Sequence, residues 1–374
     1  MWVRRLALTA ALGTLALITL GGLVTNNDAG LACPDWPLCY GSPFPKLLGG
    51  ILLEQGHRYL ATLVGLCTVV VCVALLSRAR QIGLAALLGA ATTLILAAAI
   101  AGGHFKRTTG AFPPLLVALL LLGFCATAFV FLRTRGATRL SVLALALVVW
   151  QGLLGGATVI YLLPPTVLVL HLGTSMLFLL TMVILAQKLS GESPALAGAS
   201  ARLWLGLSAS ATYLQILLGA AVRHTGAGLI CTDLPLCKGA LWPLHVHPAV
   251  HLHMAHRAFA LVVAALACTA AVKTLRAARG DGFIRALALS VPLLVALQIA
   301  LGIATILTFK DLLPVTAHLL VAALLLAAQV ALLAHAPGQA RSLLLRPRPE
   351  APRSGVAPEQ GPFATARALE KEPA

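Results

Sequence analysis

Ten continuous apolar stretches divide this chain of 374 residues. Each holds about 20 residues, the length that a helix needs to cross a ~30 Å hydrocarbon core. Only 10% of the residues are charged, whereas soluble globular domains have about 25%. The hydrophobicity is continuous and not alternating, which favours helices over barrel strands. The sequence therefore predicts an all-α integral membrane protein with ten transmembrane helices, near residues 4–24, 54–76, 82–103, 112–132, 140–160, 165–187, 203–222, 250–272, 286–308 and 312–334.

The basic residues indicate how these helices are oriented. The net charge is +16. If the ten helices cross the membrane in alternating directions, most arginines and lysines fall on one side of it, a distribution that argues against nucleic-acid binding. By the positive-inside rule that side is cytoplasmic, with both chain ends inside. The first stretch has the charged start and apolar run of a signal peptide, but its length and the absence of a clear small-x-small cleavage site favour a retained helix. Without an Arg- and Ser-rich presequence, we expect a multi-pass protein of a prokaryotic plasma membrane, with a disordered cytoplasmic tail at 336–374.

A duplicated segment organises the helices into two halves. LGGLVTNNDAGLACPDWPLCYG, from residue 20 to 41, returns as LGAAVRHTGAGLICTDLPLCKG, from 218 to 239. Each copy is followed by an apolar helix with a His-Arg pair, in LEQGHRYLA and LHMAHRAFA. A second similarity relates WQGLLGGATVIYLLPPTVLVLHL to LQIALGIATILTFKDLLPVTAHL, at a shorter offset. We therefore predict two pseudo-symmetric four-helix bundle units.

The change of offset means that the first half carries about 52 residues that the second lacks. This length suits one helical hairpin, at about 81–132, which preserves the topology of everything downstream. The expected organisation is an N-terminal unit at 1–190, which includes the hairpin, and a C-terminal unit at 200–335. The hairpin must pack outside the first unit if the helices that flank it are to meet.

Four histidines at equivalent positions of the two units point to bound cofactors. They are His57 and His171 in the first unit and His256 and His318 in the second. Ionisable residues within membrane helices are costly and usually face the bundle interior. A tetrahedral zinc site would need more ligands close together, whereas two histidines on different helices can hold a planar ring from opposite faces. The pattern predicts two bis-histidine haem sites near the outward ends of the helices.

Glu54 breaks this symmetry. It precedes His57 by three residues and so shares its helix face, while the second unit has His253 there. We interpret the first unit as the reactive one and the second as an electron-transfer or structural haem site. Arg58 and Arg257 each follow a histidine and could pair with haem propionates or reach lipid headgroups.

The eight cysteines fall into two groups. Cys33 and Cys39, like Cys231 and Cys237, lie in outward loops, where disulfides persist, so two local disulfides are expected. They are structural, or redox-active in the first unit, where the pair is close in sequence to Glu54. We expect Cys67, Cys72, Cys125 and Cys268 to be buried small residues, and His224, His245, His247 and His251 to lie in solvent or at interfaces.

Together, the cysteine loop, Glu-x-x-His-Arg, the duplicated His-Arg helix and the later histidine helices resemble the haem A synthase family, over residues 1 to about 80 and 138–335. That family has eight helices and oxidises the C8 methyl of haem O to a formyl group, making haem A for terminal oxidases. The resemblance implies that Glu54, His57 and His171 form the substrate-haem site and that His256 and His318 ligate haem b. It further implies that Cys33 and Cys39 assist the first site. The hairpin departs from the family pattern.

Bis-histidine ligation disfavours oxygen binding at the substrate iron, so we expect an oxidoreductase that acts on a CH group with water as the oxygen source. The electron acceptor or donor is not identifiable from the sequence, and haem O synthase and terminal oxidase assembly proteins are candidate partners. The main alternative is a transmembrane dihaem b-type electron carrier, which would not explain Glu54 or the cysteines. A quinone-linked thiol oxidase and a repeat-built transporter fit less of the pattern.

Overall fold

The computed structural model describes residues 1–191, 198–244, 247–278 and 281–335. Within these ranges the regular structure is helical, apart from one isolated bridge in each cysteine loop. In the described part of the chain, ten helices are long and apolar enough to cross a membrane, which confirms the predicted all-α membrane fold. They are α1 (Trp2–Asn26), α2 (Gly49–Arg78), α3 (Ile82–Thr109), α4 (Pro114–Arg133), α5 (Gly136–Ile160), α6 (Pro165–Lys188), α7 (Ala199–His224), α8 (Pro248–Ala277), α9 (Gly282–Leu307) and α10 (Leu312–Ala334), with a 3-10 turn η1 (Ala227–Leu229). The predicted tail at 336–374 and His245 lie outside the described residues.

Several helix ends follow directly from the local sequence. Helices α4, α6 and α8 begin with a proline, whose fixed φ suits the first helical position and whose missing N–H costs nothing there. Asp281 caps α9 by accepting the N–H of Ile284 at 3.0 Å. Gly110 ends α3 in the left-handed conformation. These signals fix where the turns between spans fall.

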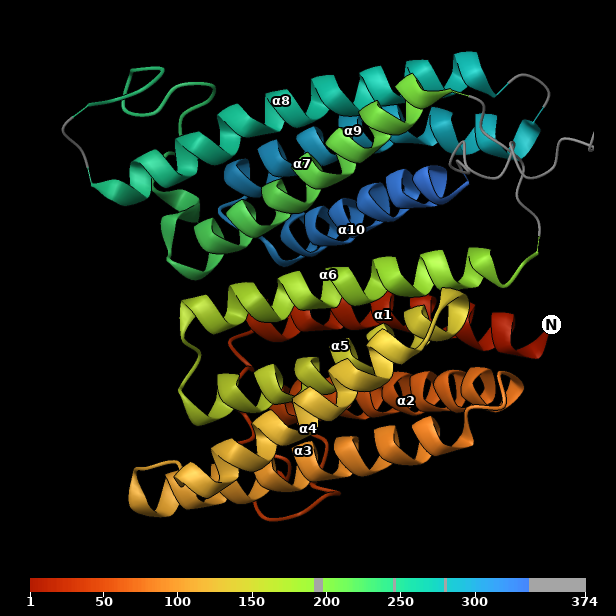
Figure 1. Cartoon of the computed structure of the whole chain (residues 1–374). Helices are drawn as coiled ribbons and strands as arrows, with labels where there is room; N and C mark the ends of the chain where they lie inside the picture. Colours follow the sequence, from red (N-terminus) through yellow and green to blue (C-terminus); the bar gives the residue numbers. More distant parts are fainter. Residues whose placement is uncertain (192–197, 245–246, 279–280, 336–374) are drawn as a thin grey trace, which may run out of the picture. The chain divides into compact units, whose positions relative to one another are not determined.

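The helices pack as two rings of four (Figure 1). In the first ring, α1 and α5 each contact both α2 and α6. In the second, α7 and α9 each contact both α8 and α10. It follows that α2 and α6 are diagonal to one another in one ring, as α8 and α10 are in the other. The rings meet where α1 packs against α10 and where α6 packs against α7 and α10.

A polar network joins the rings near one end of the helices. The side-chain amide of Asn26 donates to the hydroxyl of Thr316 at 3.1 Å. Arg223 donates to the Asn26 side-chain oxygen at 2.6 Å and to the Thr25 carbonyl at 3.4 Å. The seam is therefore held by directional bonds in addition to apolar packing.

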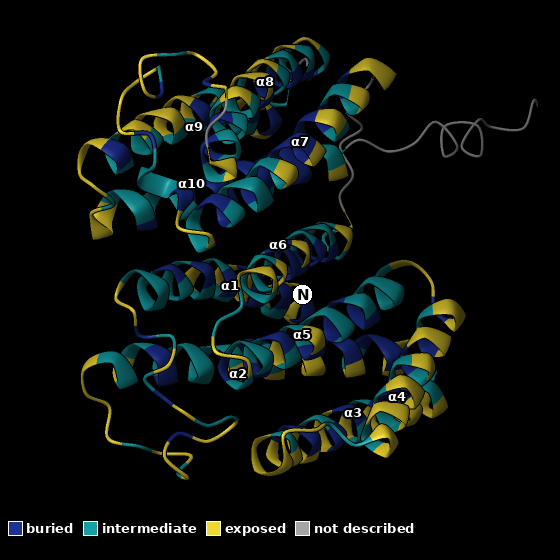
Figure 2. Cartoon of the chain, turned by 90° about the vertical axis from the view of Figure 1, so that its left-hand side faces the viewer, coloured by how far each residue is buried: buried dark blue, intermediate teal, exposed yellow. Residues whose placement is uncertain are grey.

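The hairpin of α3 and α4 lies beside the first ring. The two helices pack on each other, and both contact α5, while α3 also contacts α2. Figure 2 shows long exposed stripes on both, and large apolar side chains such as Leu115 and Leu132 are 69% exposed. These stripes suit contact with lipid tails. In a bilayer there is no hydrophobic driving force to bury apolar side chains, because the lipid tails are as apolar as the side chains.

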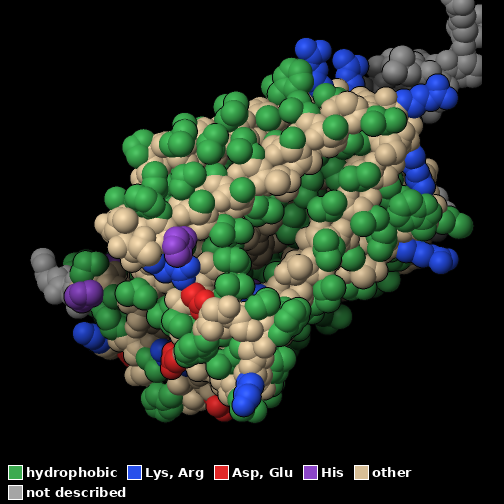
Figure 3. All heavy atoms as spheres, turned by 90° about the horizontal axis from the view of Figure 1, so that it is seen from below, with side chains coloured by type: hydrophobic (Ala, Val, Ile, Leu, Met, Phe, Trp, Pro, Cys, Tyr) green, Lys and Arg blue, Asp and Glu red, His purple; other side chains and the backbone are tan. Residues whose placement is uncertain are grey.

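Charged side chains are unevenly distributed along the helices. Figure 3 shows Lys and Arg at both ends of the visible face, whereas the acidic side chains on that face lie at one end only. The cysteine expectation is only partly right. Cys72 is buried, but Cys67 is half-buried and Cys125 and Cys268 are exposed. Lipid-facing and buried positions are equally apolar, so hydropathy does not separate them.

Candidate functional site

The four predicted histidines lie on the diagonal helices of the two rings. His57 on α2 faces His171 on α6, and the two imidazoles interact electrostatically. His256 on α8 and His318 on α10 interact in the same way. Each lies about two turns inside its helix, roughly 10 Å from the helix start at 1.5 Å per residue. The fold thus brings each predicted pair together across its ring.

A glycine on the preceding helix makes room for each imidazole. A Cβ added at any of these glycines would lie 2.9–3.5 Å from the Cε1 atom of the histidine opposite. The pairs and distances are Gly21 with His57 (3.3 Å), Gly155 with His171 (3.5 Å), Gly219 with His256 (2.9 Å) and Gly302 with His318 (3.1 Å). The four imidazoles therefore lie directly against the backbone of the preceding helix, and this close approach occurs at all four sites.

Three of the four histidines also have a glutamine partner one turn before that glycine. Gln151 donates to the His171 carbonyl at 3.0 Å. Gln215 contacts the His256 ring Nδ1 at 3.1 Å and its carbonyl at 2.9 Å. Gln298 contacts His318 Nε2 at 3.1 Å. Sequence reasoning missed these partners, although the spacing Gln-x-x-x-Gly, which places both residues on one helix face, occurs in α5, α7 and α9.

Free imidazole nitrogens make the histidine pairs suitable for a metal with two axial ligands. Within the part of the chain that the structure describes, the Nδ1 atoms of His57, His171 and His318 are buried without a hydrogen-bond partner. A buried polar atom without a partner is costly and calls for an explanation. Among the described residues, no three His, Cys, Asp or Glu side chains cluster as a tetrahedral metal would need. The donor set fits haem iron held by two histidines in each ring.

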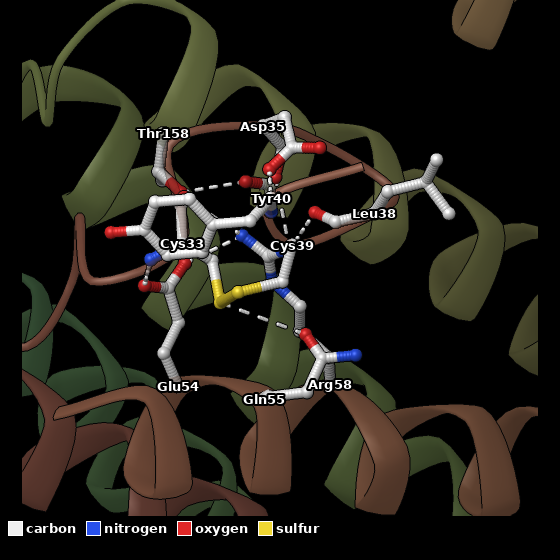
Figure 4. Close-up of polar contacts among 10 residues, drawn as sticks. Cys33, Asp35, Leu38, Cys39, Tyr40, Glu54, Gln55, Arg58 and Thr158 are labelled. Atoms are coloured by element: carbon white, nitrogen blue, oxygen red, sulfur yellow. Dashed lines mark hydrogen bonds and ion pairs between the residues drawn. A yellow bond between two sulfur atoms is a disulfide. The ribbon is translucent and has the colours of Figure 1, made fainter. Parts of the chain in front are cut away.

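Glu54 connects the first histidine helix to the first cysteine loop (Figure 4). The residue is 5% exposed. One carboxylate oxygen accepts the N–H of Cys33 at 2.7 Å, and the other pairs with Arg58 at 2.6 Å. Arg58 also donates to the carbonyls of Asp35 at 3.0 Å and Leu38 at 2.8 Å. The predicted acidic residue is therefore fixed between the loop and the helix that carries His57.

The second ring repeats this connection with an imidazole. His253 contacts the Ala227 carbonyl at 2.9 Å through Nδ1, and Arg257 donates to His253 Nε2 at 3.1 Å. Arg257 also donates to the carbonyls of Cys231 at 2.5 Å and Asp233 at 2.9 Å. Both arginines thus bind loop carbonyls, partners that the sequence does not reveal, and their proposed contact with haem propionates stays a prediction.

Both cysteine loops close with the predicted disulfides, Cys33–Cys39 and Cys231–Cys237. In the first loop Asp35 accepts the N–H groups of Tyr40 at 2.6 Å and Gly41 at 2.9 Å. In the second, the N–H of Gly239 donates to Asp233 at 3.2 Å and lowers the pKa of that carboxyl. The loops are two copies of one folded unit.

The hairpin contacts the first cysteine loop directly. Arg107 of α3 donates to the Trp36 carbonyl at 3.4 Å. The Trp36 ring lies against Gly156 of α5, where an added Cβ would be 2.8 Å from it. An apolar cavity between the hairpin, α5 and the loop is lined by Trp36, Phe112 and Tyr161, among others. The hairpin therefore packs against the first cysteine loop and the end of α5.

A family model of cytochrome oxidase assembly proteins, COX15-CtaA, matches residues 4–48 and 103–330 of the chain. The match leaves out 49–102, the segment that holds Glu54, His57 and Arg58. Those three residues are therefore identified from the internal repeat and from their contacts.

Curated relatives are similar over most of the chain. The heme A synthase of Symbiobacterium thermophilum is 30% identical over 68% of this chain and 70% of its own length. That of Geobacillus kaustophilus is 28% identical, over 84% and 86%. That of Shouchella clausii is 26% identical, over 82% and 88%.

Proposed function

We propose a reaction for this chain, which belongs to the COX15-CtaA family of cytochrome oxidase assembly proteins, that is, the haem A synthase family. In this reaction the chain oxidises the C8 methyl group of haem O to a formyl group. The product would be haem A for terminal oxidases. The observation that carries the proposal is an asymmetry between two otherwise matching sites. A buried carboxylate, Glu54, stands beside one diagonal histidine pair, and His253 stands beside the other.

The two rings receive different roles. His57 and His171 would hold the iron of the haem O substrate, and His256 and His318 would hold haem b. When bound, haem b supplies a one-electron relay next to the substrate site. The protein would position both haems through histidines on diagonal helices, glycines that let the imidazoles lie against helix backbone, and glutamines that hydrogen-bond three of the four histidines.

The proposed reaction requires a group near the substrate that can accept protons or stabilise positive charge, and we assign this role to Glu54. Conversion of a methyl group and one water to a formyl group releases four electrons and four protons, so an electron acceptor from outside the chain is required. A carboxylate at the site can accept a proton or stabilise positive charge that develops on the substrate. Glu54 is one helical turn from His57 and buried, which suits either task. The pair Cys33–Cys39, whose backbone contacts Glu54, would assist this site.

The membrane orientation completes the proposal. We place both chain ends in the cytoplasm of a prokaryote and the cysteine loops outside, where disulfides persist. Both histidine pairs would then lie near the outer face. Two haems near one face suit a reaction at that face better than electron transfer across the membrane, which disfavours the dihaem carrier alternative. Haem O synthase is the candidate partner that supplies the substrate.

Haem extraction tests the proposal. The chain and a haem O synthase are produced together, and the haems are separated by chromatography and identified by mass. Wild type should make haem A, and Glu54→Ala should stop or stall the oxidation while haem stays bound. The matched control, His253→Ala, should still make haem A. Haem b and unmodified haem O alone in a folded wild-type protein would favour the carrier.

A further inference from the structure

His57 is the one of the four histidines that lacks a glutamine partner in the described part of the chain. The internal repeat identifies which residue stands where that glutamine would be. Gln151, Gln215 and Gln298 each precede by four residues the glycine that contacts a histidine. At the fourth site, the residue four before Gly21 is Leu17. Leu17 and Gln215 are equivalent in the duplication, as are Gly21 and Gly219. Leu17 is half-buried and packs against the main hydrophobic core of the described chain.

The two rings also differ in how the existing glutamines are used. In the second ring, both amides contact a ring nitrogen, at 3.1 Å for Gln215 with His256 and 3.1 Å for Gln298 with His318. In the first ring, Gln151 reaches the backbone carbonyl of His171. The His57 ring contacts Gly21, and its Nδ1 has no hydrogen-bond partner in the described structure. Each imidazole of the second pair therefore has a side-chain hydrogen bond to one ring nitrogen, Nδ1 in His256 and Nε2 in His318, which leaves the other nitrogen for a metal. Neither imidazole of the first pair has such a bond among the described residues, because Gln151 holds only the His171 backbone.

This difference bears on metal ligation. A second hydrogen bond to a ligating imidazole fixes its tautomer and orientation, and its loss typically costs about 10- to 100-fold in metal affinity. Each glutamine also has a buried side-chain oxygen without a partner, which could accept the N–H of a metal-bound imidazole. Leu17 offers only dispersion contacts, so nothing holds the His57 ring against rotation except its packing.

We propose that Leu17 makes His57 the most weakly held of the four axial ligands, so that the first ring exchanges its haem while the second keeps it. This inference rests on the proposed function, which requires haem O to enter and haem A to leave the first ring. It identifies Leu17, Gln215 and Gln298 as positioning residues. The exchangeable and the permanent haem site would then both use two histidine ligands. They would differ in how firmly the residue next to a ligand, leucine or glutamine, holds the imidazole.

Transfer of haem to excess apomyoglobin tests this in the purified, haem-loaded full chain. We expect wild type to lose haem in a fast and a slow phase. Leu17→Gln should slow the fast phase about tenfold, and Gln215→Met should speed the slow phase about tenfold. Leu17→Met, which matches the length of glutamine without its amide, should leave the fast rate unchanged. Equal rates for Leu17→Gln and Leu17→Met would overturn the inference, as would a protein that holds no haem.

A spectroscopic signature separates positioning from a general effect on stability. In the ferric protein, Leu17→Gln should shift one of two low-spin electron paramagnetic resonance signals and leave the other in place, while Leu17→Met shifts neither. A shift of both signals, or of neither, in Leu17→Gln would contradict the assignment. Haem analysis of the same cells tests the proposed function separately, because two-phase exchange that follows these substitutions without haem A formation would refute only the synthase.

Discussion

The two cysteine loops are anchored in the same way by different side chains. In the first ring, Arg58 binds loop carbonyls and pairs with Glu54, which accepts the N–H of Cys33. In the second, Arg257 binds loop carbonyls and donates to His253, which contacts the Ala227 carbonyl. An anchor does not require a carboxylate, because the imidazole serves in the second ring. The comparison indicates that Glu54 is present for more than holding the loop.

The largest expected effect is the loss of one haem from either ring. His57→Ala and His318→Ala should each reduce bound haem to about half of the wild-type amount, because each removes one of two axial ligands in a separate ring. The pyridine haemochrome assay, set against protein concentration, measures the ratio. Full retention in either variant would show that the diagonal pairs are not the ligands.

Removal of a disulfide compares the loops as structural units. Each bridge closes a loop of sequence separation 6, for which the chain-entropy account gives about 2 kcal/mol of stability. Changing both cysteines of either loop to serine should therefore lower thermal stability by a similar amount. If Cys33–Cys39 assists the chemistry, only the first-loop variant should also lose haem A formation beyond its loss of folded protein. Equal haem A per folded protein in the two variants would make both bridges structural.

A smaller effect should follow from filling the glycine positions. A Cβ at Gly219 would lie 2.9 Å from the His256 ring, whereas one at Gly155 would lie 3.5 Å from His171. Alanine adds about 1 kcal/mol of helix propensity at both positions, but only the first substitution must displace a ring. We expect Gly219→Ala to reduce haem in the second ring and Gly155→Ala to be nearly neutral, by haem-to-protein ratio. A larger loss of haem from Gly155→Ala than from Gly219→Ala would show that the imidazoles move when they ligate the haem iron.

Much of this architecture can be predicted from the sequence. The spans follow from apolar length, and the histidines and disulfides follow from the duplication, since a repeated polar residue in a membrane helix is rarely accidental. The contacts of Arg58 and Arg257 could not be predicted, because their partners are backbone carbonyls that no residue type marks. The exposure of Cys125 and Cys268 was also beyond sequence reasoning. The glutamines were visible as a repeated spacing, but only the fold shows which histidine each one meets.

The measurement that tests the account most directly is a reciprocal exchange of the residues that distinguish the rings. Glu54→His gives the first ring the anchor found in the second, and His253→Glu does the reverse. Both should fold and bind haem, because the two loops are copies of one folded unit and either side chain can accept a hydrogen bond from the arginine one turn further on. Haem extraction from cells that supply haem O should find haem A with His253→Glu and little or none with Glu54→His. Wild-type amounts of haem A from Glu54→His would contradict the account, because the carboxylate would then be only an anchor.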